Sequence, residues 1–435
     1  MQSVIVREYA RLTTAAVARV SLDEARISES AFDWLCQESA RLRGFGASLV
    51  QMDSRRWLRL DNYVGVIETP CGTRIEILPK CSMEGDDPRD ARRLLRKMLT
   101  RCLDLTTRET GPTDLQTFDA PLTEWVMRQF LQALDALVKR GLRFGYHAVQ
   151  DEQRFLRGRL QVAKQLRQPP SRQHLLQIEH DVFDADRPEN RLLRLALNRV
   201  CRATRDSSNW RLSHELATFL APIPPSTDVV SDFRRWRNDR LLAHYRNVRP
   251  WCSLILNEEM PLTVHGGWHG SSLLFPMEKV FERYVESCLR QNLPSGAQLK
   301  ATASTQHLVA RHRTSPMFLL KPDFLLRQDK HTWVLDTKWK LIDESLAGGK
   351  DKYGLSQSDF YQLFAYGQRY LDGQGDMFLV FPRTPQFSQP LDVFEYSDAL
   401  RLWVVPFDLE SGRLLGGPLD PCHQNADLIV PRTNG

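Results

Sequence analysis

The segment LLKPDFLLRQDKHTWVLDTKWK (319–340) constrains the fold of this chain more than any other. It is typical of two apolar strands joined by a polar turn at 327–332. Asp336 and Lys338 are two residues apart in the second strand, so both side chains should leave the same face. Because an unpaired carboxylate is costly inside an apolar strand, Asp336 should have a cationic partner. Asp323 follows Pro322, and we expect it at a kink in the neighbouring strand, facing the same point.

These three side chains together suit the hydrolysis of a phosphodiester. Two carboxylates on adjacent strands are suitable ligands for Mg²⁺, with Mn²⁺ as an alternative, because such ions keep several waters. Lys338 could then orient the attacking water and stabilise charge that develops on the phosphate. Taken alone, the spacing favours a salt-bridged surface hairpin, and the context of the motif reverses that preference.

The helices predicted on either side of the motif carry further polar groups. The upstream segment FPMEKVFERYVESCL (275–289) places Glu278 and Glu282 beside an apolar stripe, and helix geometry slightly prefers Glu278. The downstream segment 358–371 places Gln362 and Tyr366 on one face, where Tyr366 could be a core or a DNA-facing aromatic. The predicted order is helix 276–291, strands within 298–339, helix 356–371, and strands near 376–382 and 400–406, which indicates a mixed sheet flanked by helices.

The rest of the chain predicts an α/β protein with three regions, since 435 residues exceed one ordinary core. Residues 1–115 should form a mixed α/β domain, 116–264 a mainly helical region, and 265–435 the domain with the motif. The Gly-rich HGGWHG (265–270) marks the last boundary. The elements expected upstream are helix 29–42, a hairpin over 58–80 with Gly72 in its turn, and helices 88–103, 122–140 and 187–203, the last begun by a capping box at Asp186–Glu189.

The charge is mildly basic, at a formal +6, which permits an anionic partner without requiring one. Two basic stretches, 154–173 and 232–246, could be solvated surface or could contact phosphate or an acidic partner surface. Arg311, Arg313 and Lys340 flank the motif strands and could hold the DNA backbone or merely solvate the strand ends.

Other classes of protein are disfavoured. The eight cysteines are scattered without a C-x-x-C pair, which is typical of reduced thiols rather than zinc ligands or disulfides. No apolar run approaches the roughly 18 residues that a membrane helix needs, so we expect a cytoplasmic protein that binds no membrane. No G-x-x-x-x-G-K-[ST] motif occurs, and the nearest approach is GGKD (348–351), so this chain should bind no nucleotide itself.

Taken together, the motif and its helices resemble the PD-(D/E)xK nuclease superfamily, in the version with a glutamate on the first helix and Q-x-x-x-Y on the helix after the lysine strand. The resemblance extends to the McrC family, the nuclease subunit of 5-methylcytosine-specific (type IV) restriction systems. The residues that carry it are NYVGVIE (62–68), IEILPK (75–80), LLRKML (94–99), FLRGRLQ (155–161), ENRLLRLAL (189–197), MEKVFERYV (277–285), PDFLL (322–326) and LDTKWK (335–340).

The resemblance implies that Asp323, Asp336 and Glu282 bind metal, that Lys338 is the catalytic lysine and that Gln362 supports the site. It also implies double-stranded, methylated DNA as the substrate. The partner would be an oligomeric AAA+ GTPase ring whose GTP hydrolysis the chain stimulates. The first two-thirds of the chain would dock on this ring, and the basic tract 154–173 is a candidate for the docking segment. A RecB-like repair nuclease is disfavoured by the resemblance outside the last third, and a catalytically inert adaptor by the intact trio.

Overall fold

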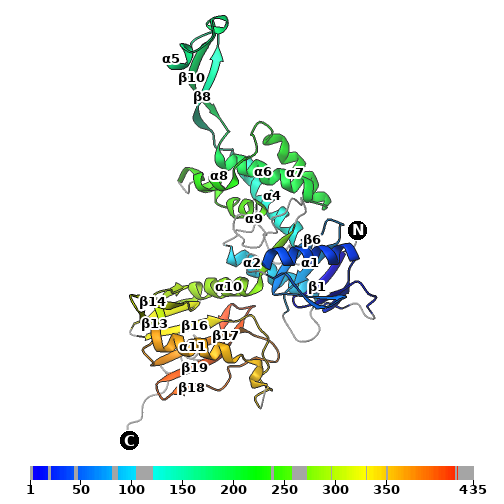
Figure 1. Cartoon of the computed structure of the whole chain (residues 1–435), viewed down its shortest axis with the longest axis vertical. Coiled ribbons are helices and arrows are strands. Elements are labelled where there is room, and N and C mark those ends of the chain that lie inside the picture. Colours follow the sequence, from blue (N-terminus) through cyan, green and yellow to red (C-terminus); the bar gives the residue numbers. More distant parts are fainter. Residues whose placement is uncertain are drawn as a thin grey trace. The chain divides into compact units, whose positions relative to one another are not determined.

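The computed structural model describes residues 3–17, 21–43, 48–80, 87–103, 121–236, 240–256, 272–294, 296–329, 331–348, 351–416 and 419. They form two compact units (Figure 1). Unit 1 comprises Met1–Leu105, Leu115–Leu122 and Leu262–Gly435, and unit 2 comprises Thr106–Asp114 and Thr123–Pro261. The expected mixed α/β class is confirmed. No described helix is long and apolar enough to span a membrane, and the six described cysteines are free thiols.

Unit 1 begins with two four-stranded sheets. Their elements are β1 (Ser3–Arg7), β2 (Arg11–Thr13), β3 (Glu24–Arg26), α1 (Glu29–Arg43), β4 (Val50–Ser54), β5 (Trp57–Leu60), β6 (Tyr63–Glu68), β7 (Arg74–Leu78) and α2 (Pro88–Cys102). One sheet has the order β3-β2-β5-β4. The other has the order β1-β7-β6-β11, in which β11 is Leu273–Pro276. The helices expected at 29–42 and 88–103 and the hairpin with Gly72 in its turn are therefore confirmed. Leu94, Leu95 and Leu99 of α2 are buried, as the apolar stripe predicts.

The last strand of the second sheet comes from far along the chain. β11 (Leu273–Pro276) pairs antiparallel with β6, and Gly65 lies opposite Leu274. A Cβ at Gly65 would lie 1.9 Å from the carbonyl oxygen of Leu273, so only glycine permits this approach. β11 runs directly into α10 (Met277–Asn292), whose first amide donates to the carbonyl of Asn62 at 2.8 Å. The N-terminal sheet thus positions the helix that carries Glu278 and Glu282.

This pairing links the two ends of the chain within unit 1, whereas the sequence pattern predicted three successive regions. Met1–Leu105 and Leu262–Gly435 belong to one unit, in which a strand after the Gly-rich break completes the N-terminal sheet. The break itself, 265–270, lies outside the described residues. A chain ending near residue 265 would lack β11.

A seven-stranded sheet forms the rest of unit 1. Its strands are β12 (Gln298–Ala301), β15 (Phe324–Gln328), β16 (His331–Thr337), β17 (Gly375–Pro382), β18 (Phe394–Ser397), β19 (Leu400–Asp408) and β20 (Arg413–Leu414). The order is β12-β15-β16-β17-β19-β18, with β20 beside β19. β16, β17 and β19 are parallel, while β15 is antiparallel to β16. The expected mixed sheet is confirmed, with more strands than the pattern predicted.

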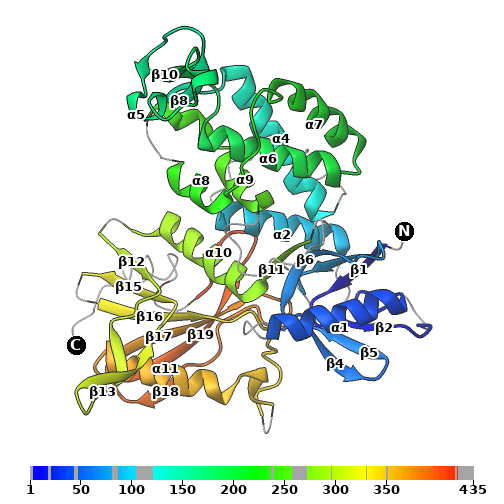
Figure 2. The ribbon, with the colours of Figure 1, turned by 45° about the horizontal axis from the view of Figure 1, so that its top comes forward.

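Helices cover both faces of this sheet (Figure 2). Phe281 of α10 packs edge-on against Phe407 of β19, whereas Val404, three residues earlier, shares a core cluster with Leu363 of α11 (Gln357–Tyr370). Residues an odd number apart point to opposite faces of a strand, so α10 and α11 lie on opposite sides. α11 approaches closely at Gly367, where a Cβ would lie 2.7 Å from the sulfur of Met377. β13 (Gln306–His312) and β14 (Ser315–Leu320) form a separate hairpin, and Lys352–Gly354 form a short 3₁₀ turn, η3.

Unit 2 combines helices with one hairpin. Its elements are α4 (Leu122–Arg140), β8 (Gly145–Gln153), β9 (Arg159–Leu160), α5 (Val162–Gln165), η1 (Pro170–Arg172), β10 (Leu176–Asp184), α6 (Pro188–Ala203), α7 (Ser207–Phe219), α8 (Val229–Arg235), η2 (Arg240–Tyr245) and α9 (Arg249–Leu256). The helices expected at 122–140 and 187–203 are confirmed. Trp125 of α4 and Trp251 of α9 pack edge-to-face in the buried core of unit 2, with ring centroids 5.3 Å apart.

The three-stranded sheet β8-β10-β9 was not predicted, because its strands are largely exposed and lack a clean apolar alternation. β8 and β10 pair over nine residues each and project from the helices (Figure 1). The predicted capping box is wrong: Arg187 is the N-cap residue of α6 and makes no capping bond, and Asp186 instead accepts from the guanidinium of Arg191.

Candidate active site

The structure brings Asp323, Asp336 and Lys338 together at the ends of β15 and β16. These strands pair with Phe324 opposite Leu335, so Asp323 and Asp336 are adjacent to this pair on the two neighbouring strands. Lys338 directly follows Thr337, the last residue of β16, and its amide donates to the carbonyl of Val380 at 2.9 Å. Asp336 and Lys338 share a face as expected, since Lys338 Nζ lies 2.7 Å from Asp336 Oδ2.

Asp336 is a buried carboxylate with an unsatisfied oxygen. Its residue is 2% exposed, between buried neighbours of the central strand. Oδ2 accepts no hydrogen bond from the described residues, so the contact with the Lys338 ammonium is an ion pair without hydrogen-bond geometry. Burial, followed by the negative charge of Asp323, raises the pKa of Asp336 to about 7 despite the nearby lysine. A cation bound beside Asp336 would favour its ionised form.

Asp323 is held at the strand end by a single residue. The backbone amide and the hydroxyl of Thr337 both donate to Asp323 Oδ2, each at 2.7 Å. The fixed carboxylate acts electrostatically on Asp336 and on Glu282 of α10, and it raises the pKa of both. Thr337, which anchors Asp323 by two bonds, carried no signal in the sequence beyond its place between Asp336 and Lys338.

Gln362 and Tyr366 of α11 stand behind the lysine. Gln362 Oε1 accepts from Lys338 Nζ at 3.4 Å, and Gln362 Nε2 donates to the hydroxyl of Tyr366 at 2.6 Å. That hydroxyl donates in turn to the carbonyl of Lys321 at 3.0 Å. Tyr366 is 3% exposed. Of the two alternatives for Tyr366, the structure favours a core aromatic, because the residue is buried and its hydroxyl accepts from Gln362.

The donor set at this point fits a small divalent cation. Asp336 Oδ2 is buried without a hydrogen-bond donor, and Asp323 lies on the adjacent strand. Two carboxylates with water are a usual ligand set for Mg²⁺. Among the described residues, however, no three His, Cys, Asp or Glu side chains are gathered closely enough to hold a metal ion. The three-carboxylate cluster expected from Asp323, Asp336 and a helical glutamate is therefore not assembled in this conformation.

The two glutamates of α10 occupy different surroundings. Glu282 interacts electrostatically with Asp323 and accepts from Lys279 Nζ at 2.5 Å. Burial, then the charge of Asp323, raises the pKa of Glu282. Glu278 instead lines a neighbouring pocket and interacts electrostatically with Glu8. Of the two, Glu282 is better placed to complete the site.

An open pocket of about 470 Å³ lies beside Lys338. It is lined by Glu8, Tyr9, Lys80, Glu278, Lys338, Trp339, Lys340, Leu341, Ser356 and Asp359. Lys340 thus borders the site, as its position next to the motif predicts. Asp359 was missed by the sequence reasoning, although it precedes Gln362 by three residues and so shares its helix face. The contribution of Glu8, Tyr9 and Lys80 could not be inferred, because they are more than 250 residues away along the chain.

The other two predicted basic residues lie elsewhere. Arg311 is the penultimate residue of β13 and Arg313 lies in the turn to β14. Both side chains are exposed, and Arg311 Nε donates to the carbonyl of Arg313 at 3.1 Å. They mark the tip of a hairpin that pairs with no strand of the seven-stranded sheet among the described residues.

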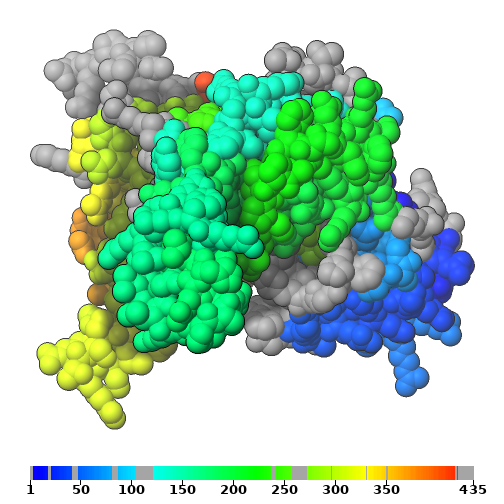
Figure 3. All heavy atoms as spheres, turned by 90° about the horizontal axis from the view of Figure 1, so that it is seen from above, coloured from blue at the N-terminus to red at the C-terminus, as the bar shows by residue number. Residues whose placement is uncertain are grey.

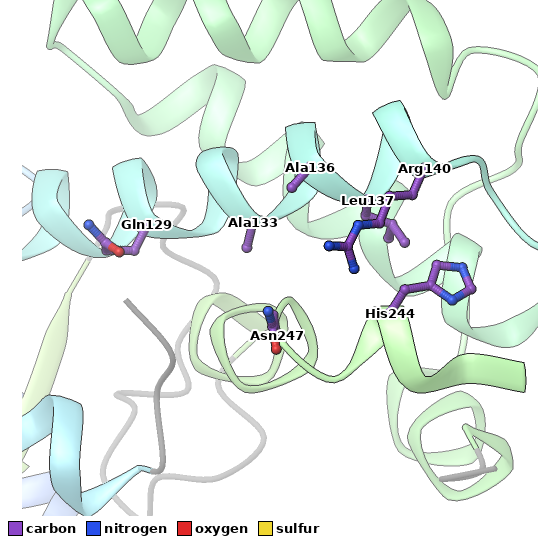
Figure 4. Close-up of a pocket in the computed structure, with 7 residues that line it drawn as sticks. All are labelled: Gln129, Ala133, Ala136, Leu137, Arg140, His244 and Asn247. Atoms are coloured by element: carbon purple, nitrogen blue, oxygen red, sulfur yellow. The ribbon is translucent and has the colours of Figure 1, made fainter. Parts of the chain in front are cut away.

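A further pocket in unit 2 has little catalytic potential. It lies between α4 and the segment that contains η2 (Figure 4). Its lining residues are Gln129, Ala133, Ala136, Leu137, Arg140, His244 and Asn247. Because this set contains no carboxylate and no thiol, we place the candidate active site in unit 1.

The chain is similar in fold to two solved structures, while no curated protein matches it. The first is a chain of the half-complex from the tetradecameric assembly of Thermococcus gammatolerans McrB AAA+ hexamers with bound McrC, with a TM-score of 0.69 and 20% identity over 99% of this chain and 100% of that chain. The second is a chain of the cryo-EM structure of the Thermococcus gammatolerans McrBC complex, with a TM-score of 0.50 and 21% identity over 68% of this chain and 89% of that one.

These likenesses concern the fold. A family model described as McrBC 5-methylcytosine restriction system component matches residues 58–382. That range includes the candidate trio as well as the whole of unit 2 from α4 to α9. The chain therefore belongs to the McrBC 5-methylcytosine restriction system component family.

Proposed function

We propose that this chain is the Mg²⁺-dependent DNA endonuclease subunit of a modification-dependent restriction system, with a PD-(D/E)xK nuclease domain around its seven-stranded sheet. The observation that carries the proposal is the buried carboxylate of Asp336, which has a raised pKa and lies beside Asp323 and the Lys338 ammonium. In a salt-bridged surface hairpin this carboxylate would be exposed to water, whereas Asp336 is 2% exposed. The sheet with α10 and α11 on opposite faces and the Gln362–Lys338 contact support the same assignment.

In this proposal Asp323 and Asp336 hold the cation, with Glu282 as the candidate third carboxylate. Mg²⁺, or Mn²⁺ in its place, would supply Lewis acidity toward the phosphate and the attacking water. Thr337 keeps Asp323 oriented through its two hydrogen bonds. Lys338 is aimed by Gln362, and its ammonium can stabilise negative charge that develops on the phosphate oxygens. Tyr366 holds Gln362 in place and touches no substrate.

The partner in this proposal is an AAA+ GTPase ring whose GTP hydrolysis the chain stimulates. Support comes from the similar solved structure, an assembly of McrB AAA+ hexamers with bound McrC. Within unit 2, the hairpin of β8 and β10 is a suitable docking element. Figure 3 looks down on this hairpin, whose side chains form the surface nearest the viewer. Its exposed large apolar residues include Tyr146, Phe155, Leu156, Val162, Leu166 and Phe183. The basic tract 154–173 lies between its two long strands.

The substrate proposed is double-stranded, methylated DNA. Arg311, Arg313 and Lys340 would bind phosphates, and recognition of the modified base would reside in the partner. The chain itself binds no nucleotide in this proposal; GGKD (348–351) lies partly outside the described residues.

The proposal is tested by incubating the full chain with methylated and unmethylated plasmid, with and without the GTPase partner, GTP and Mg²⁺. Cutting of the methylated plasmid only in the complete mixture, lost on chelation of the metal, is expected. Cutting from DNA ends without the partner would instead indicate a repair nuclease. Stimulation of GTP hydrolysis without any cutting would indicate an inert adaptor.

A further inference from the structure

The pocket beside Lys338 has two walls from distant parts of the chain. Lys338 and Lys340 come from the segment that follows β16. Glu8 and Tyr9 come from the turn after β1, and Lys80 follows β7. All of them belong to unit 1. The N-terminal sheet therefore supplies side chains at the place where a DNA strand would pass to reach Lys338.

The Glu8 side chain is held by hydrogen bonds to one of its two carboxylate oxygens. Its Oε1 accepts from the indole Nε1 of Trp339 at 2.6 Å and from the amide of Lys80 at 2.8 Å. The residue is 1% exposed, and its Oε2 has no hydrogen-bond partner among the described residues. Burial raises the pKa of Glu8 to about 7. A buried acceptor that lines a pocket and lacks a donor is costly, which is a reason to expect a ligand that donates to it.

Tyr9 is an exposed aromatic on a strained backbone. Its φ is +63°, in the left-handed region that a bulky side chain rarely adopts. The turn is closed by the amide of Ala10, which donates to the carbonyl of Arg7 at 3.1 Å. The side chain is 43% exposed although it lines the pocket. Strain of this kind is found where a side chain must be held ready for a ligand.

The pocket thus offers a flat aromatic ring, a buried acceptor and three ammonium groups, beside two further carboxylates, Glu278 and Asp359. A free phosphate would use the lysines and leave Glu8 and Tyr9 unexplained. A divalent cation would leave the ring and the lysines unexplained, and no described set of three metal-ligating side chains is gathered here. A nucleotide uses the ring, the buried acceptor and the lysines together, because a base stacks on an aromatic ring, its amino edge donates to a carboxylate, and its phosphates attract lysines.

We propose that this pocket receives one unstacked nucleotide of the DNA strand next to the phosphate presented to Lys338. Tyr9 stacks on the base, Glu8 Oε2 accepts from an exocyclic amine such as that of cytosine or adenine, and Lys80 and Lys340 contact the flanking phosphates. The inference rests on the proposed function only in taking DNA as the substrate. It adds base discrimination at the cut, located in the nuclease subunit and separate from recognition of the modified base.

The test measures binding of three 12-nucleotide single strands to the full chain by fluorescence anisotropy, with no metal added: oligo-dC, oligo-dT and a fully abasic strand. Four variants are compared after thermal melting has established that each is folded. Tyr9→Ala removes the ring and Tyr9→Phe keeps it. Glu8→Gln keeps an oxygen for Trp339 and Lys80 but turns the free oxygen into a donor. Met52→Ala, at an exposed apolar residue of β4, is the control.

The wild-type chain should prefer oligo-dC over the abasic strand by about 5- to 100-fold, the range expected for one base–aromatic stack. Tyr9→Ala should bring that ratio close to one, while Tyr9→Phe and Met52→Ala retain it. Glu8→Gln should lower the preference for oligo-dC over oligo-dT without a change in melting temperature, which a purely structural role of Glu8 would not produce.

Equal base-to-abasic ratios in wild type and Tyr9→Ala would overturn the stacking site, and an unchanged dC-to-dT ratio in Glu8→Gln would overturn the reading of the base by Glu8. Either result stands apart from the proposed nuclease function, because no cutting is measured. A chain that cuts methylated plasmid but shows neither effect refutes this inference alone.

Discussion

The residues around the pocket beside Lys338 and those on the hairpin of unit 2 differ in their exposure to water. At the sheet edge, Asp336 and Glu8 are buried at 2% and 1% exposure, and each has an oxygen without a hydrogen-bond donor. On the hairpin, Tyr146 and Leu166 are 76% and 81% exposed. The first region keeps charge away from water, whereas the second presents apolar and basic side chains to it.

Under the proposed function, this difference would separate chemistry from docking. Electrostatic catalysis requires groups that are fixed and poorly solvated before the substrate arrives, which the strands β15 and β16 and the helix α11 provide. Docking requires surface that gains free energy when it leaves water, which the exposed hairpin provides. Changes in one region should therefore leave the task of the other intact, and the following experiments test that separation.

The largest effect is expected from Lys338→Ala. It removes the ammonium beside Asp336 and should lower cleavage of methylated plasmid by about 10²–10³-fold, as for loss of one charge-stabilising group. Stimulation of the partner's GTP hydrolysis should stay near wild type. Lys300→Ala, on the edge strand β12 of the same sheet, is the matched control and should cut normally. A folded Lys338→Ala protein that no longer activates the GTPase would break the comparison.

The hairpin should show the reverse pattern. Leu166→Asp places a charge on an 81% exposed apolar residue and should lower GTPase stimulation about tenfold or more if this residue is an interface anchor. Its melting temperature should hardly change, since exposed substitutions alter stability by only about 0.5 kcal/mol. Phe219→Asp, 57% exposed at the end of α7 in the same unit, is the control. Equal losses in both variants would remove the hairpin's special role.

A smaller effect concerns pH. The folded chain keeps the Asp336 proton to about pH 7, whereas the unfolded chain releases it near the ordinary aspartate pKa of 3.8. The free energy of unfolding contributed by this group therefore falls as the pH rises from about 4 to 7. The Asp336→Asn variant has no titrating carboxyl at this position, so it does not lose this free energy of unfolding. Without metal, the variant should melt about 2–4 °C above wild type at pH 8.

In the presence of Mg²⁺, the wild-type chain should instead melt above the Asp336→Asn variant at pH 8. Because the cation binds the ionised carboxylate, it should raise the melting temperature of the wild-type chain more at pH 8 than at pH 5. Differential scanning calorimetry at both values checks this. A wild-type chain that Mg²⁺ stabilises equally at pH 5 and pH 8, or an Asp336→Asn protein stabilised as much as wild type, would contradict the assignment of Asp336 as a ligand.

The smallest effect is expected at the tip of the β13–β14 hairpin. Arg311→Glu and Arg313→Glu should weaken DNA binding uniformly across sequences and reduce the slope of log affinity against log salt by about 1 for each phosphate that the variant no longer binds. Arg56→Glu, in the exposed turn between β4 and β5, serves as the control. Salt slopes equal to wild type in both hairpin variants would mean that these residues only solvate the turn.

The sequence by itself determined the elements whose residues carry a strong local pattern. The apolar stripe of α2 and the alternation around Ile75 and Ile77 predicted their helix and strand, because period 3.6 and period 2 follow from backbone geometry alone. The same reasoning placed Asp336 and Lys338 on one face, since residues two apart in a strand must share it. It failed for β8 and β10, whose exposed strands need no apolar alternation.

Only the tertiary structure decided what stands opposite these residues. The burial of Tyr366, the anchoring of Asp323 by Thr337, and the meeting of Glu8 with Trp339 across 331 positions of the chain depend on how strands and helices pack. The pairing of β11 with β6, allowed by the missing side chain of Gly65, joins the N-terminal sheet to the helix of Glu282. Local periodicity contains no information about such contacts, because they arise from burying surfaces of distant segments against each other.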